Sequence, residues 1–149
     1  MSEESSPIGR WALMTMESDS GSALFRVRTD HPEDPQRAAF EQSLVIRWEY
    51  EGEAGLPDIP TRAAMEEFED AVADLVAEAG CSYLMLVTTG MGQKEWVYYV
   101  ADPADFMCRF NGLLHESPAF PLRILCHQDP EWSYWSQVRE RCEEEGENG

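Results

Sequence analysis

Basic residues are scarce in this sequence. The chain has 11 lysines and arginines against 29 aspartates and glutamates, a formal net charge of -18, and Lys94 is its only lysine. A field of that sign repels nucleic acid and anionic membranes, so we expect neither as a partner. It attracts basic proteins, and a basic protein is the partner that the charge favours. The alternative is that the acidic residues serve solubility alone.

Long apolar runs and paired cysteines are also missing. The longest strongly apolar run covers about residues 83–87, and the first residues have neither the basic nor the apolar part of a signal peptide. The cysteines show no paired spacing, so we expect reduced, buried thiols rather than disulfides at Cys81, Cys108, Cys126 and Cys142. These features predict a cytoplasmic protein.

The sequence contains enough for one folded domain. A chain of 149 residues with 43% hydrophobic residues can bury a core without a metal or disulfides. We predict a single α+β domain over residues 9–142, between disordered acidic tails at residues 1–8 and 143–149.

Local patterns predict the strands and helices. Apolar residues alternate from Leu44 to Tyr50, as in a strand with one buried face, whereas those from Met65 to Val76 recur every three or four positions, as in a helix. The predicted strands cover about residues 11–16, 23–28, 44–50, 81–89, 95–100 and 122–127, and the predicted helices about residues 61–79, 103–115 and 131–144.

This order of elements predicts an α+β sandwich, with a mainly antiparallel sheet of about six strands and two or three helices on one face. From the third strand to the sixth the order is β-α-β-β-α-β, which is that of a ferredoxin-like unit. An N-terminal hairpin and a C-terminal helix extend this core.

The segment Gly90-Met-Gly-Gln93 has the glycines of a phosphate-binding loop and is followed by Lys94. A phosphate-binding loop leads into the N-terminus of a helix, whose free N–H groups hold the anion. Here residues 95–100 are aromatic and β-branched, which predicts a strand. We therefore predict a hairpin in which the glycines adopt positive φ and Lys94 binds no phosphate.

No spacing in the sequence predicts a catalytic, cofactor or metal site. The histidines lack a nucleophile or a second ligand pair nearby, and Cys126-His127 with Asp129 is more simply the end of a strand. We expect Asp129 to cap the last helix and Trp132 to be its first core residue. Two carboxylates could still meet in the fold for acid–base catalysis, so enzyme activity stays open although the sequence favours none.

Aromatic residues leave a further alternative, a small-molecule pocket lined by Trp48, Trp96, Tyr98 and Trp135. Aromatic side chains at alternating strand positions are more often core residues. We therefore expect these four in the core.

An acidic row follows the helix predicted at residues 61–79. Its members recur at four-residue steps and are Glu66, Asp70, Asp74 and Glu78. Like charges at this spacing repel one another, and no lysine or arginine follows Arg62 on this helix. The row is either a solvated face or a docking stripe for a basic partner, whose charge would relieve the repulsion.

Three segments are similar to recurrent blocks of a known family: Gly55-Leu56-Pro57, Thr88 to Pro103, and Asp129-Pro-Glu-Trp-Ser-Tyr134. The chain thereby resembles the bacterial domain of unknown function 695 over roughly residues 9–135. In the hairpin block, Gln93-Lys94 departs from this family, which tends towards arginine there. The resemblance implies no assigned reaction. A weaker similarity in layout to the acidic ribonuclease E regulator B family implies protein binding.

Charge, acidic row and resemblance together favour a non-enzymatic interaction or regulatory domain that docks a basic partner, without cofactor or metal. The alternative is an enzyme or small-molecule-binding protein whose site is assembled only in the fold.

Overall fold

The computed structural model describes residues 5–6, 9–18, 21–29, 38–51, 57–73, 82–117 and 120–148. The strands in this part of the chain are β1 (Ser5–Ser6), β2 (Gly9–Ser18), β3 (Gly21–Arg28), β4 (Gln42–Glu49), β5 (Ser82–Gly90), β6 (Gln93–Val100) and β7 (Leu122–Gln128). The longer helices are α2 (Ile59–Ala71), α4 (Pro103–Leu113) and α5 (Ser133–Asn148).

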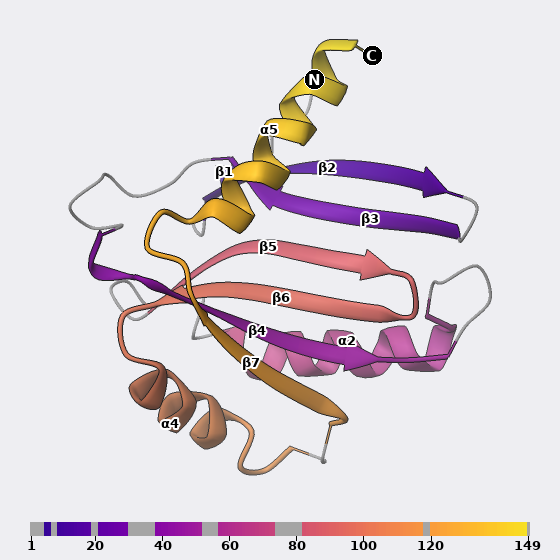
Figure 1. The fold of residues 1–149 in the computed structure, drawn as a ribbon. Coiled ribbons are helices and arrows are strands. Elements are labelled where there is room, and N and C mark those ends of the chain that lie inside the picture. Colours follow the sequence, from indigo (N-terminus) through magenta and orange to yellow (C-terminus); the bar gives the residue numbers. More distant parts are fainter. Residues whose placement is uncertain are drawn as a thin grey trace.

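The strands form one sheet in the order β1-β2-β3-β5-β6-β4-β7, with every pair of neighbours antiparallel (Figure 1). The hairpin of β2 and β3 joins the sheet beside β5, as an extension of the four strands β5, β6, β4 and β7. The predicted α+β class with a mainly antiparallel sheet is therefore confirmed.

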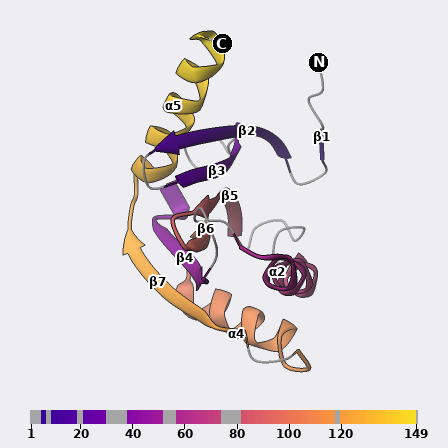
Figure 2. The ribbon, with the colours of Figure 1, turned by 90° about the vertical axis from the view of Figure 1, so that its right-hand side faces the viewer.

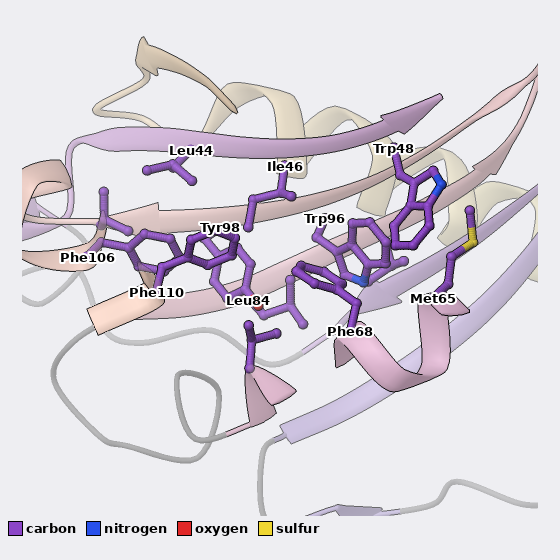
Figure 3. Packing of buried hydrophobic residues seen from close by; sticks show 13 residues of the cluster. Leu44, Ile46, Trp48, Met65, Phe68, Leu84, Trp96, Tyr98, Phe106 and Phe110 are labelled. Atoms are coloured by element: carbon purple, nitrogen blue, oxygen red, sulfur yellow. The ribbon is translucent and has the colours of Figure 1, made fainter. Parts of the chain in front are cut away.

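Helices α2 and α4 cover one face of the sheet (Figure 2). The side chains that β4 and β6 send to this face are large and buried, and Trp96 lies against Phe68 of α2 with ring centroids 4.8 Å apart (Figure 3). Tyr98 packs in the same way on Phe106 of α4, at 5.0 Å. This aromatic layer holds the two helices in place, because large buried rings contribute most of the apolar area.

Helix α5 lies against the opposite face. Its first turn carries Trp135, and Trp132 directly precedes it; both indoles are fully buried in a cluster with Val45, Val97 and Tyr99. Successive side chains in a strand point to opposite faces of the sheet, so the same strands that pack on α2 and α4 also pack on α5. Two of the helices share one face, as predicted for two or three of them, and the third covers the other. β4, expected to have one buried face, is therefore buried on both.

The predicted hairpin is confirmed. Gly90 pairs with Gln93, and Met91 and Gly92 form the loop with φ values of 58° and 81°. Positive φ at both loop residues matches the twist of the two strands. Gly90 itself is needed because a Cβ atom there would lie 2.7 Å from the Cα atom of Ala23 in β3.

Two details differ from the sequence-based expectation. The helix predicted to begin at about residue 61 begins at Ile59, because the carboxylate of Asp58 caps it by accepting the N–H of Thr61 at 2.9 Å. Cys108 and Cys126 are exposed rather than buried, and Cys81 lies outside the described residues.

The predicted boundaries of one helix and of the two tails can be compared with the described residues. The helix predicted at residues 61–79 lies outside the described residues from position 74 onward. Ser5–Ser6 pairs with β2, and α5 continues to Asn148, so both segments predicted as tails contribute residues to elements. The limits of the domain stay predictions.

Candidate functional site

The first candidate surface is the outer side of α2. Glu66, Glu67 and Asp70 are exposed there, and none of them forms an ion pair with a residue that the structure describes. Asp74 and Glu78, the other predicted members of the row, lie outside the described residues. The structure thus places half of the predicted row, on a solvated helical surface.

Glu69 lies on the same helix but points toward the sheet. Its carboxylate accepts the indole N–H of Trp96 at 2.8 Å. The Nζ atom of Lys94 and a terminal nitrogen of Arg26 lie 3.7 and 3.6 Å from the same oxygen. Burial lowers the pKa of Lys94 below its ordinary value of 10.5, and the charge of Glu69 opposes that shift. The only lysine of the chain therefore neutralises a helix carboxylate.

A second ion pair lies on the opposite face of the sheet. Arg47 of β4 donates its Nε–H to Glu95 of β6 at 2.8 Å, and the Glu95 side chain is only 10% exposed. The two residues are direct cross-strand partners. Successive side chains of β6 thus point to opposite faces of the sheet. Lys94 and Trp96 contact Glu69 on the face with α2, and Glu95 contacts Arg47 on the other face.

A cleft of about 450 Å³ lies beside this pair, over β4 and β7 and next to the start of α5. Polar side chains from four elements line it, among them Arg47, Glu95, His127, Tyr134 and Gln137. The terminal nitrogens of Arg47 have no acceptor among the described residues. Burial raises the pKa of Tyr134, with Glu95 adding to the shift, so this phenol stays a hydrogen-bond donor at neutral pH. Arg47 and Tyr134 therefore offer hydrogen-bond donors in the cleft, beside the carboxylates of Glu95 and Asp129.

Asp129 fixes the wall of the cleft. One carboxylate oxygen accepts the N–H of Ser133 at 2.7 Å, and the other accepts the N–H of Tyr134 at 3.1 Å and the hydroxyl of Tyr99 at 2.7 Å. Asp129 thus caps the last helix as predicted, but the helix begins at Ser133 rather than at about Glu131, and Trp132, the expected first core residue of the helix, precedes it. Burial and the hydrogen bond to Asp129 raise the pKa of Tyr99 far above its ordinary value of 10.0.

Trp132 also attaches the start of α5 to the sheet. Its backbone has a φ of 56°, in the left-handed region that bulky residues rarely adopt. The indole stacks on Tyr99 with centroids 4.3 Å apart and donates to the carbonyl of Phe40 at 2.8 Å. A strained backbone held by so many contacts keeps the approach to α5, and the cleft beside it, in one conformation.

The other sequence candidates behave as structural residues. The aromatic side chains of Trp48, Trp96, Tyr98 and Trp135 are buried in the core, as expected. His127 is exposed at the cleft. Within the described residues, no group of three histidine, cysteine, aspartate or glutamate side chains could hold a metal ion.

Sequence reasoning missed the cleft, although one signal was available. Residues 96–100 form an unbroken apolar run, which is typical of a strand buried on both faces rather than one. Such a strand requires a second layer, and the cleft lies where that layer ends.

Two of the segments that resemble family blocks have structural roles. The segment from Thr88 to Pro103 contains the hairpin of β5 and β6, and the segment that begins at Asp129 attaches α5 to the sheet. A model of a family of unknown function, DUF695, matches residues 9–138. The chain belongs to this family. No curated protein matches it. In the described part of this DUF695 domain, no helix is both long and apolar enough to cross a membrane.

Proposed function

We propose that this DUF695 domain is a non-enzymatic interaction or regulatory domain of the bacterial cytoplasm, and that it docks a basic protein through the exposed carboxylates of α2. The observation that supports it is the contrast along one helix. Glu69 meets two cations of the sheet, whereas Glu66, Glu67 and Asp70 face solvent without an ion pair among the described residues.

The exposed carboxylates of α2 repel one another. Carboxylates three or four residues apart on a helix destabilise it by a few tenths of a kcal/mol per pair. A basic partner would relieve this cost, and the long-range attraction would raise its association rate. Asp74 and Glu78 would extend the surface by two further turns of the predicted helix.

Charge reversal tests the proposal. We expect the double variant Glu66→Lys, Asp70→Lys to lose capture of a basic partner from lysate at low salt, with unchanged thermal stability. The matched control is Glu116→Lys, Glu140→Lys, which makes the same change in net charge at exposed positions outside α2. Equal capture by the two variants would rule out α2 as the docking surface.

The cleft supports a second candidate function, binding of a small polar molecule or an enzymatic reaction on one. The volume of the cleft, about 450 Å³, lies within the range of ligand sites. The terminal nitrogens of Arg47 have no acceptor in the described part of the chain. Native mass spectrometry of the purified protein tests this. A bound molecule retained by the wild type and absent from Arg47→Gln would support the cleft, and a bare polypeptide mass for both would count against it.

A further inference from the structure

The exposed edge of β7 is the basis of a further inference, independent of the surface on α2. β7 is the last strand of the sheet and pairs only with β4 among the described residues (Figures 1 and 2). Its register with β4 is regular from Leu122 to Gln128, without a bulge. Regular, uncovered edges of this length are templates for pairing with another strand.

The backbone groups that face outward can be identified. Asp129 donates its N–H to the carbonyl of Glu41 at 2.7 Å, and these two residues continue the β4–β7 register. In an antiparallel ladder, hydrogen-bonded pairs alternate with pairs that are not bonded. Residues 123, 125 and 127 therefore bond to β4, and Leu122, Ile124, Cys126 and Gln128 direct their N–H and C=O groups to the open edge.

We propose that this edge pairs with β7 of a second copy of the chain, antiparallel and centred on Cys126. In that register Cys126 faces Cys126 of the second copy, and Ile124 faces Gln128 of the second copy. Every outward N–H and C=O group of these three residues then has a partner. The pairing extends the sheet of one copy into that of the other around a two-fold axis.

The ends of the strand limit the pairing to this length. Leu122 would lie opposite Pro130, which has no N–H to donate. The N–H of Leu122 is already bonded to the carbonyl of Phe120 at 2.8 Å. The paired segment therefore ends at Ile124 of one copy and Gln128 of the other.

Charge complementarity favours a second copy as the occupant. β7 contains no acidic residue, in a chain of net charge -18, so its own side chains add no negative charge to repel a second copy. Arg123 lies near its beginning, and Asp129 and Glu131 follow its end. Antiparallel pairing centred on Cys126 sets Arg123 opposite Asp129 of the second copy, and the symmetry repeats this pair. Arg123 also lies 3.7 Å from Glu49 of its own chain, in an exposed pair that leaves its guanidinium accessible.

Proline at position 126 tests the proposal. The N–H of Cys126 points outward and its side chain is exposed, so Cys126→Pro removes a donor to the second copy without removing a bond to β4. We expect the wild type and Cys126→Ala to be dimers by sedimentation equilibrium. The dissociation constant of Cys126→Pro should rise at least about tenfold, because each copy loses a hydrogen bond. A monomeric wild type, or equal dissociation constants for the two variants, would overturn the proposal.

Thiol oxidation provides a test that needs no proline. Directly opposed, hydrogen-bonded residues have Cα atoms about 5.5 Å apart, within the span of a disulfide. Diamide, which accepts the two electrons and two protons released by a pair of thiols, should link Cys108→Ala chains through Cys126. Peptide mapping of the product that finds no Cys126–Cys126 linkage would exclude the register centred on this residue.

Discussion

Tyr99 donates its hydroxyl hydrogen to Asp129 at 2.7 Å, and this bond joins an inner strand of the sheet to the segment that starts α5. The same carboxylate also accepts two backbone N–H groups at the start of the helix. One side chain therefore fixes the position of α5 over the second face of the sheet.

Replacement of Asp129 by alanine should destabilise the domain by roughly 2 to 3 kcal/mol, because a cap and a bond to a buried phenol are lost together. Urea denaturation followed by circular dichroism measures this. The matched control is Asp102→Ala at the start of α4, where the carboxylate accepts only exposed N–H groups and the loss should be about 1 kcal/mol. Equal losses would mean that the bond to Tyr99 contributes nothing.

Two glycines should respond to alanine in opposite directions. At Gly90 a Cβ atom would lie 2.7 Å from the backbone of Ala23, with φ at +152°, so Gly90→Ala should destabilise the domain by about 2 to 3 kcal/mol. At Gly112, on helix α4, a Cβ atom would meet nothing within 4 Å. Gly112→Ala should therefore stabilise the domain by about 0.5 kcal/mol. Thermal melts of the two variants that shift in the same direction would contradict this reading of the hairpin.

The hairpin shows what could be predicted from sequence alone. Its glycines and the aromatic strand that follows are local signals, and they predicted the turn correctly. The class of the fold followed from the same kind of periodicity. The Asp129 cap was local too, because its two N–H partners lie within five residues of it.

The cleft could not be predicted in this way. Arg47 and Glu95 are 48 residues apart in sequence and meet only because β4 pairs with β6 in one register. The apolar pattern of the last helix predicted that it packs, but not on which face. Likewise the partners of Glu69 come from β3 and β6, so the helix sequence alone could not show that this carboxylate, unlike its neighbours, is neutralised.

The pair of Arg47 and Glu95 should behave as a unit. Arg47→Leu leaves the carboxylate of Glu95 buried without its cation, which should cost about 2 to 4 kcal/mol of stability. The double variant Arg47→Leu, Glu95→Leu removes both charges and should recover most of that loss, because two apolar side chains of suitable size can replace a buried pair.

A double-mutant cycle in urea measures the coupling between these two residues. The exposed pair of Arg123 and Glu49, at 3.7 Å, is the control, and its coupling should stay below about 1 kcal/mol. Additive effects at Arg47 and Glu95 would show that the buried pair does not stabilise the cleft.

Alkaline pH should unfold the domain through its buried tyrosines. Burial raises the pKa of Tyr98 and of Tyr99 well above the ordinary 10.0. The folded state therefore keeps two protons that the unfolded chain loses, so stability is complete below pH 10 and falls as the pH rises further. One unit above 10 the loss should be about 1.4 kcal/mol for each group. Lys94 acts in the opposite direction, because its lowered pKa favours the folded state as the pH rises. It is one group against four, because the pKa values of Tyr50 and Tyr134 are raised as well.

Urea denaturation at a series of pH values, with phenolate absorbance recorded on the folded protein, measures this dependence. Tyr98→Phe should flatten the slope above pH 10, because the proton of this phenol no longer contributes to the difference between the folded and unfolded states. The chain has 5 tyrosines, and at least Tyr98 and Tyr99 should remain un-ionised until the protein unfolds. Ionisation of all five near pH 10 in a protein that keeps its native circular dichroism would show that these phenols reach water, and that the aromatic layers on the two faces of β6 are open to solvent.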